Sequence, residues 1–282
     1  MQKTIDDITL FCDGLDHPEC VAVHRDGSIW AGGEAGQVYC ISSDGKEVKE
    51  VVNTSGFVLG IAFSPIEDWL AICDLKNRCI WRYDLPTGNL SQLATEIDGN
   101  PIRIPNFPVF DAKGNLYVSE SGAFREVSGA IYKIDSKGRR DVWHQGPFNF
   151  ANGMALSADG KKLYVICSFL PGVEQVEIRE DNSAGERSVI LHMPQTCPDG
   201  IAIDKEGNLF ISCYAPNTIY KLSPEGQLST LILDRQAHTI CNPTNIAFGG
   251  TNHQQLFIAN LGRWHIARMN MDAPGLSLIQ NL

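Results

Sequence analysis

Six positions at nearly regular spacing carry side chains that could act together. Five of the six have a side-chain oxygen, and none is a histidine, which disfavours a histidine-rich zinc site. Carboxylate and amide oxygens are the donors that a hard cation such as Ca²⁺ binds, so these residues would form a cation site if they met in space. The positions, separated by 40, 47, 46, 47 and 45 residues, are Glu19, Leu59, Asn106, Asn152, Asp199 and Thr244.

Each of these residues taken alone is more readily explained as part of a turn. Asn and Asp are favoured at the starts of strands, where their side chains hydrogen-bond to nearby backbone groups. The joint pattern is what indicates a site, and it requires six chain segments that converge on one axis.

A repeated unit carries these positions, and the stretch 198–213, PDGIAIDKEGNLFISC, shows it most clearly. Apolar residues alternate with smaller or polar ones on both sides of a turn at Asp204–Gly207, the period-2 pattern of half-buried strands. A third strand and a less regular fourth follow in most copies, as at Leu228–Leu233. Four short antiparallel strands recurring every 45 residues or so predict a propeller blade.

Six such blades fill residues 1–282, so the sequence predicts an all-β, six-bladed β-propeller of four-stranded antiparallel blades in a single domain. The innermost strands of a propeller line its channel, which would place the six positions in a ring. The segment Ile8–Leu15 precedes the first copy and has no blade of its own. We expect it to complete the last blade near Leu276–Ile279 and cover the exposed strand edges.

Composition excludes several partner classes. The net charge of −10 argues against nucleic acid. No apolar window approaches the roughly 20 residues of a membrane span, and MQKTIDDITLF lacks the apolar core of a signal peptide. The nine cysteines include no Cys-x-x-Cys pair, so we expect reduced thiols in a cytoplasmic protein, with a zinc or disulfide framework as the alternative. The oligomeric state is not indicated.

Several strings resemble the gluconolactonase, regucalcin (senescence marker protein) and luciferin-regenerating enzyme family: HPECVAV, NFPVFDAKGNLYVSE, ANGMALSADGKKLYV and PDGIAIDKEGNLFISCY. The resemblance covers essentially the whole chain. It implies a six-bladed propeller with a divalent metal in the channel, and many members hydrolyse sugar lactones or related esters. It also implies that Glu19, Asn152 and Asp199 are metal ligands, and that Asn106 either ligates the metal or binds substrate.

The chain departs from this family between Arg103 and Pro108. The family often has Arg-x-Asn-Asp-Gly, whereas here Phe107 replaces the Asp and Arg103 stands three residues before Asn106 instead of two. Cys20 also replaces a common Gly. The two altered family residues contact sugar hydroxyls in the sugar lactonases, so the departures indicate a less polar or differently shaped substrate.

The predicted reaction is hydrolysis of a small-molecule lactone or ester. One divalent cation would polarise the carbonyl while Asp199 acts as general base on the attacking water. Ca²⁺ fits the all-oxygen donors best, with Zn²⁺, Mn²⁺ and Mg²⁺ as alternatives. Further candidates for substrate binding are Arg103, His17 and Glu120.

Simpler interpretations remain for some of these residues and for the protein. His17 would otherwise be a loop histidine, and Glu120 and Asp74, at the ends of second strands, would be surface carboxylates. The insertion at 121–130, SGAFREVSGA, could form part of a lid. Alternative functions are a non-catalytic cation- or protein-binding propeller, a phosphoester hydrolase, and a condensing enzyme related to strictosidine synthase.

Overall fold

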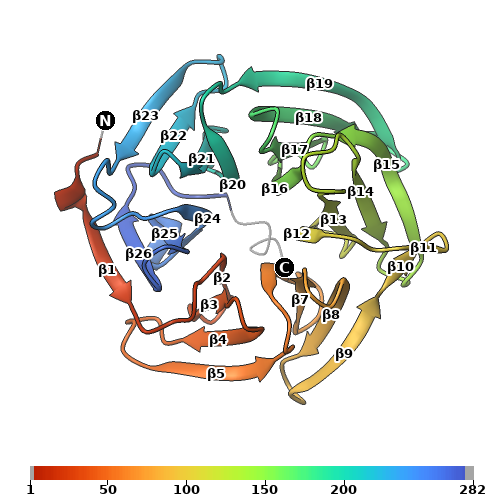
Figure 1. Ribbon diagram of the computed structural model, residues 1–282, viewed down its shortest axis with the longest axis horizontal. Helices are drawn as coiled ribbons and strands as arrows, with labels where there is room; N and C mark the ends of the chain where they lie inside the picture. The colour runs from red at the N-terminus through yellow and green to blue at the C-terminus, as the bar shows by residue number, and fades with distance from the viewer. Residues whose placement is uncertain (1–2, 277–282) are drawn as a thin grey trace.

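The computed structural model describes residues 3–276 and contains six four-stranded antiparallel sheets arranged around a central channel (Figure 1). This confirms the predicted six-bladed, all-β architecture. Only two short 3₁₀ turns, η1 (Ile5–Asp7) and η2 (Thr251–His253), break the run of strands among these residues.

The strands follow one another outward within each blade. The first blade holds β2 (Cys20–Val23), β3 (Ile29–Gly32), β4 (Gln37–Ile41) and β5 (Val48–Asn53); the second β6 (Val58–Phe63), β7 (Trp69–Asp74), β8 (Cys79–Asp84) and β9 (Asn89–Ala94); the third β12 (Pro105–Phe110), β13 (Leu116–Glu120), β14 (Gly129–Ile134) and β15 (Arg140–Phe148). The fourth holds β16 (Ala151–Leu156), β17 (Lys162–Cys167), β18 (Gly172–Ile178) and β19 (Ala184–His192); the fifth β20 (Cys197–Ile203), β21 (Leu209–Ala215), β22 (Thr218–Leu222) and β23 (Leu228–Leu233). The sixth has β24 (Pro243–Gly249), β25 (Gln255–Asn260) and β26 (His265–Asn270) from the C-terminal part of the chain.

The sixth blade is completed by the N-terminal strand β1 (Ile8–Cys12), which pairs antiparallel with β26. Its partner residues differ from those expected, because Ile8 lies opposite Met269 and not opposite the segment at 276–279. Leu276 instead donates its backbone N–H to Ile203 of the fifth blade. Residues 277–279 lie outside the described part of the chain.

The repeated turn has the structural role that its sequence predicts. In the fifth blade, the Asp204 carboxylate accepts hydrogen bonds from the backbone N–H groups of Glu206 and Asn208 and from the Asn208 side chain. The turn joins β20 to β21, whose Ile201 and Ile211 face each other and are buried. In several first and second strands of the blades, such as β7, β13 and β16, every side chain is buried, because each sheet packs against a neighbouring sheet on both faces.

A two-stranded hairpin between the second and third blades was not expected. It consists of β10 (Glu96–Ile97) and β11 (Asn100–Pro101), joined through Asp98 and Gly99, which both have positive φ. Two residue pairs are too short a run to produce a period-2 pattern in the sequence.

Close approach of neighbouring inner strands explains two glycines beside the candidate ligands. A Cβ on Gly153 would lie 2.6 Å from the Asp199 carbonyl oxygen, and one on Gly200 would lie 2.5 Å from the Thr244 carbonyl oxygen. No larger side chain fits at such distances, so glycine lets the inner strands of the last three blades converge.

Candidate metal centre

The candidate ligands stand at the beginnings of inner strands, and therefore at one end of the channel. Glu19 immediately precedes β2, Asn106 and Asn152 are the second residues of β12 and β16, and Asp199 is the third residue of β20. The hairpin register places the end of each second strand beside them, as in the pairs Ala151–Cys167 and Pro198–Cys213. We call this end of the channel the mouth.

Two carboxylates meet at the mouth. Burial raises the pKa of Asp199 to about 7, although a hydrogen bond from Asn152 acts in the opposite direction. Burial also raises the pKa of Glu19 well above its usual range, and the negative charges of Asp199 and Glu34 raise it further. Both side chains are half-buried, and two carboxylates that are partly withdrawn from water and repel one another favour a positive charge between them.

An orphaned oxygen supports a cation at this point. Glu19 Oε2 is buried and has no hydrogen-bond partner among the described residues. Buried oxygens without partners are costly and uncommon in native proteins. A divalent cation would satisfy this oxygen and offset the repulsion between Glu19 and Asp199, so the residues present fit the metal that the sequence predicts.

The two carboxamides are held in place by serines. Asn152 Nδ2 donates to Ser168 Oγ at 3.2 Å, and the same amide hydrogen-bonds to Asp199. Asn106 Nδ2 donates to Ser121 Oγ at 3.0 Å. Because the amide nitrogen makes these contacts, the carbonyl oxygen of each Asn is available as a ligand or acceptor.

The same serines belong to a set of hydroxyls that join successive blades. Each donates to a backbone carbonyl at the inner-strand start of the next blade, and so fixes the positions of the candidate ligands relative to one another. The contacts, all 2.7 Å, run from Ser121 Oγ to Ala151, from Ser168 Oγ to Pro198, from Ser212 Oγ to Thr244 and from Thr244 Oγ1 to Glu19.

Two of the six aligned positions do not supply a ligand oxygen. Leu59 is apolar and buried, as its sequence requires. The hydroxyl of Thr244 is engaged with the Glu19 carbonyl, and so closes the ring between the last blade and the first. Of the six aligned positions, four therefore remain as candidate ligands: Glu19, Asn106, Asn152 and Asp199.

Glu120 binds backbone groups. Its carboxylate accepts hydrogen bonds from the backbone N–H groups of Arg103, Ile104 and Gly122, at 2.8–3.1 Å. The expectation that Glu120 and Asp74 are surface carboxylates is wrong, because both are buried and both hold loop backbone. Glu120 thus positions the chain before Asn106, while Arg103 itself is exposed.

His17 lies beside the mouth. Its Nδ1 is 2.8 Å from Asp16 Oδ1 and 3.3 Å from Glu34 Oε2, and its ring meets Trp264 edge-on at 4.9 Å. The negative charge of Glu34 also helps to raise the pKa of Glu19. His17 therefore contacts residues that surround the carboxylates.

Sequence reasoning missed Ser121, Ser168, Tyr214 and Glu34. The first three are equivalent in the blade register, since each directly follows the residue that pairs with the one before a candidate ligand. An alignment of the second strands, in addition to the first, would have found them. Tyr214 lies near both carboxylates, whose charges contribute to raising the pKa of its phenol after the larger effect of burial.

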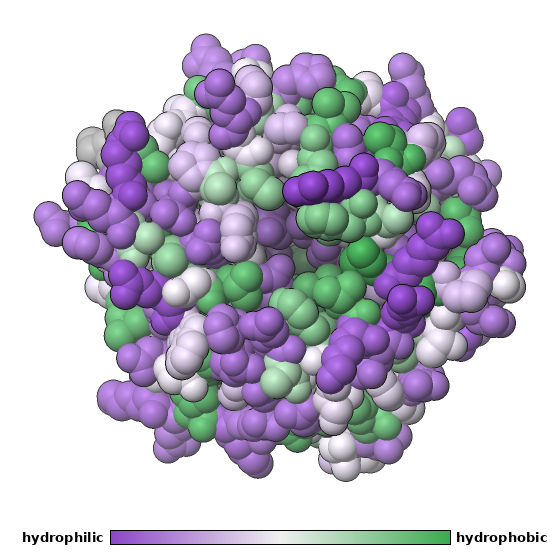
Figure 2. All heavy atoms as spheres, in the orientation of Figure 1, coloured by the Kyte–Doolittle hydropathy of each residue, from purple (hydrophilic) through white to green (hydrophobic). Residues whose placement is uncertain are grey.

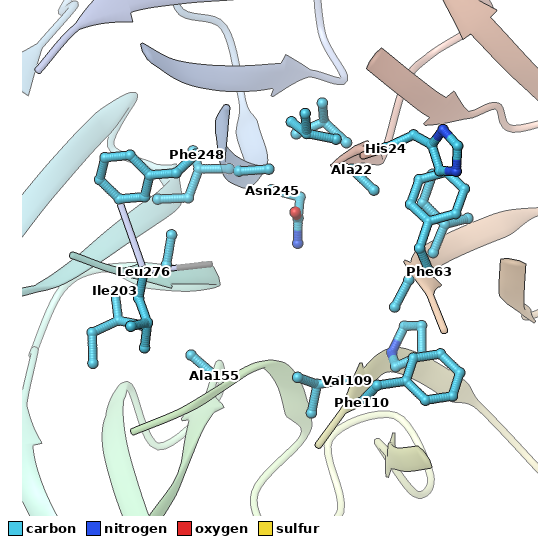
Figure 3. A pocket seen from close by; sticks show the side chains of 18 of the residues that line it. Ala22, His24, Phe63, Val109, Phe110, Ala155, Ile203, Asn245, Phe248 and Leu276 are labelled. Atoms are coloured by element: carbon cyan, nitrogen blue, oxygen red, sulfur yellow. The ribbon is translucent and has the colours of Figure 1, made fainter. Parts of the chain in front are cut away.

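A cavity of about 370 Å³ lies at the other end of the channel, where the inner strands end. Figure 3 shows side chains that line it. Its wall is mostly apolar, and the side chains of Phe63, Phe110, Phe248 and Leu276 surround it. Asn245 points toward the middle of this cavity. The carboxylates are absent from its lining, so we treat the cavity as separate from the candidate metal centre.

Among residues 3–276, no cluster of three or more His, Cys, Asp or Glu side chains could hold a metal. The candidate centre is instead a mixed set of two carboxylates and two carboxamides. In the same part of the chain, all nine cysteines are free thiols, and no helix is long and apolar enough to cross a bilayer.

The fold and this mouth define a six-bladed propeller with an oxygen-rich site at one end of its channel. The sequence model described as the SMP-30/Gluconolactonase/LRE-like region matches residues 84–261. The chain belongs to this family.

Two relatives show the range of similarity. The chain is 28% identical to a gluconolactonase of Zymomonas mobilis over 211 residues, which cover 68% of this chain and 57% of that protein. It is 29% identical to regucalcin of Pongo abelii over 135 residues, or 45% of this chain and 41% of that one. The chain thus spans only about half the length of these relatives.

Solved structures support the fold over nearly the full length. A gluconolactonase from Xanthomonas campestris superposes with a TM-score of 0.80 at 19% identity, covering 95% of this chain and 89% of that one. A calcium-binding protein, regucalcin, from Agrobacterium tumefaciens superposes with a TM-score of 0.76 at 17% identity, covering 95% and 97%. At these identities the likeness concerns the fold.

Proposed function

We propose that this protein is a divalent-cation-dependent hydrolase that opens a lactone. The observation that carries the proposal is the pair of half-buried carboxylates, Glu19 and Asp199, with the buried Glu19 Oε2 atom lacking a partner among the described residues. Glu19, Asn152 and Asp199 would hold the cation. Asn106 would either join them or contact the substrate.

The family supports both parts of the proposal. Relatives named gluconolactonase suggest lactone hydrolysis, and a structural neighbour described as calcium-binding favours Ca²⁺. All-oxygen donors also favour Ca²⁺, with Mg²⁺, Mn²⁺ and Zn²⁺ as alternatives. The free, mostly buried thiols are consistent with a reducing, cytoplasmic location, which is part of the proposal.

When bound, the cation would supply a Lewis acid for the carbonyl oxygen and lower the pKa values of its ligands. Asp199 takes the proton of the attacking water, since it is a carboxylate at the mouth and is ionised above pH 7 even with its raised pKa. Asn152 orients Asp199 through their hydrogen bond, and Ser168 holds Asn152. Arg103 is exposed and its backbone N–H is held by Glu120; its guanidinium would bind the part of the substrate that projects from the mouth.

Hydrolysis of a lactone panel tests this proposal. We expect turnover in the presence of Ca²⁺ or Mn²⁺, loss of turnover with chelator, and recovery when the cation returns. Asp199→Asn should lower kcat by at least about a hundredfold, the usual effect of removing a general base, whereas Glu126→Gln on the exposed insertion should not change it. Cation binding without turnover of any lactone would instead support a binding propeller.

A further inference from the structure

Four aromatic side chains of the described residues are exposed, and all four lie at the mouth. Their exposed fractions range from 36% for Phe169 to 63% for Phe124, with Tyr214 and Trp264 between them. The other Phe, Tyr and Trp side chains of the described chain are buried or half-buried. Each of the four stands at, or within four residues after, the end of the second strand of its blade.

Second strands end where inner strands begin, so these aromatic residues share the mouth with the candidate ligands. On the face drawn in Figure 2, apolar surface borders the central hollow over the inner ends of the third and fourth blades. Exposed apolar patches beside a hollow commonly mark ligand-binding sites.

Three phenylalanines form a continuous wall on one side of the mouth. Phe169 is the central ring: it lies 4.6 Å from Phe150 and 5.2 Å, edge-to-face, from Phe124. Phe124 and Phe150 are 6.2 Å apart, also edge-to-face. These distances are those of favourable aromatic pairs, so the wall is a packed structure that still presents Phe124 and Phe169 to solvent. We call it the aromatic wall.

The aromatic wall is tied directly to the candidate ligands. Phe169 follows Ser168, which accepts the hydrogen bond from Asn152. Phe150 precedes Asn152 by two residues, and its carbonyl accepts the Ser168 N–H at 3.2 Å. Phe124 lies in the insertion after Ser121, the partner of Asn106. A group bound on the wall would therefore lie next to the amides of the site.

The other side of the mouth is also aromatic. Tyr214 is so near Glu19 and Asp199 that both negative charges help to raise the pKa of its phenol, after the larger effect of burial. Trp264 packs against His17. A substrate that enters between the two sides therefore passes exposed aromatic rings on both.

Two side chains next to Asn106 have no hydrogen bond to offer a polyhydroxy sugar. The carboxylate of Glu120 is used by three backbone N–H groups, and the half-buried Phe107, which follows Asn106, has no hydrogen-bonding side chain. Sugar hydroxyls removed from water without hydrogen-bond partners would weaken binding. An aromatic ring loses no such bonds and would bury apolar area against Phe124 and Phe169.

We infer that the substrate is a lactone or ester that bears an aromatic ring, with the ring on the aromatic wall and the carbonyl directed toward Asn152 and Asp199. This inference rests on the proposed hydrolase function. In the reaction the water oxygen bonds to the carbonyl carbon, the ester C–O bond breaks, and the departing oxygen takes a proton. The second water proton is released, and the product bears one carboxylate and one hydroxyl group, which are on the same molecule when the substrate is a lactone; no oxidation state changes.

The test compares an aromatic lactone, dihydrocoumarin, with a sugar lactone, δ-gluconolactone. The wild-type protein with Ca²⁺ should show the higher kcat/KM for dihydrocoumarin. Phe169→Ala should lower that value about tenfold, mostly through KM, and leave the value for δ-gluconolactone within twofold. The control Leu228→Ala alters an exposed apolar residue on the outer strand of the fifth blade and should change neither. The inference is overturned if the wild type has the higher kcat/KM for the sugar lactone, or if Phe169→Ala leaves kcat/KM for dihydrocoumarin unchanged.

A binding measurement separates this inference from the proposed function. Calorimetry with the lactam analogue of dihydrocoumarin, which resists hydrolysis, needs no turnover. Binding that is lost in Phe169→Ala, and also in the second variant Trp264→Ala, supports the aromatic site even if no lactone is hydrolysed. Cation-dependent hydrolysis of δ-gluconolactone without lactam binding overturns the inference and leaves the hydrolase proposal standing. Thermal unfolding of each variant confirms that it is folded.

Discussion

At the scale of single residues, Glu19 and Asp199 are the side chains whose environment calls for a counter-charge. Both pKa values are raised by burial first, and the charge of Asp199 then raises that of Glu19. The fold does not require two carboxylates at this place, because neutral side chains of similar size would fill it without electrostatic repulsion. Their cost to stability is consistent with a functional site.

We predict that Asp199→Asn stabilises the protein in the presence of chelator. A neutral amide of nearly the same shape removes a charge that burial disfavours, so the free energy of unfolding at pH 8 should rise by about 1 kcal/mol or more. Addition of Ca²⁺ should stabilise the wild type and have no effect on the variant, since ligand binding stabilises only the form that binds it. Urea unfolding with and without Ca²⁺ measures both effects.

The control for this prediction is Glu126→Gln, which neutralises an exposed carboxylate and should leave both unfolding curves unchanged. Destabilisation of the chelated protein by Asp199→Asn would contradict the account, because it would mean that Asp199 supports the fold.

Residue types alone predicted part of the site. Carboxylates and carboxamides at nearly regular spacing indicated Glu19, Asn106, Asn152 and Asp199 as candidates, and all four lie at the mouth; their role as ligands stays a prediction. The role of Thr244 could not be predicted, because an oxygen-bearing side chain can bind either a ligand or a neighbouring carbonyl. Only the position of the next blade shows that its hydroxyl meets Glu19.

At the scale of elements, the hydroxyls at the ends of second strands connect blade packing to the site. We predict that Ser168→Ala costs about 1–2 kcal/mol of stability, since the Pro198 carbonyl and the Asn152 amide each lose a buried partner. It should also weaken Ca²⁺ binding about tenfold, because residues that orient metal ligands commonly have that effect. Calorimetry and urea unfolding measure the two losses.

The matched control is Ser157→Ala in the same blade. Ser157 is also buried and hydrogen-bonds within a turn at the other end of the hairpin. The Ser157→Ala variant should be less stable than the wild type and should bind Ca²⁺ with the same affinity. Equal affinities in the two variants would show that Ser168 does not position Asn152 for a cation.

The N-terminal strand gives a second prediction at this scale. Phe11 of β1 is buried, meets Phe257 edge-on at 5.0 Å and lies under Arg268. Phe11→Ala should therefore destabilise the protein by about 3–4 kcal/mol. Leu10→Ala on the same strand changes an exposed residue and should stay within about 0.5 kcal/mol of the wild type. Thermal unfolding compares them, and similar values would mean that β1 does not close the ring in solution.

The sequence predicted where the strands lie, but it did not predict all of the strand pairings. The period-2 pattern and the Asp/Gly turns predicted the hairpins, and the turn at Asp204 forms as expected. The partner of β1 was misjudged, since apolar runs in β26 and in the last residues of the chain look alike in sequence. The hairpin of β10 and β11 is too short for any periodic signal.

At the scale of the whole molecule, the propeller separates two regions of one channel. The carboxylates, the amides and the exposed aromatic residues gather at the mouth, and the apolar cavity lies beyond them. Six blades bring together side chains that are some 40–47 residues apart in sequence. This explains why the site is visible only when the repeats are aligned.

The central claim is that one cation is held between Glu19, Asn152 and Asp199. The most direct measurement is a crystal structure of the protein grown with Mn²⁺, with anomalous scattering recorded at the manganese edge. The account predicts a single peak on the channel axis, with oxygen atoms of all three residues within roughly 2.0–2.6 Å of it. A map with no peak at the mouth, or with its peak on other residues, would contradict the account.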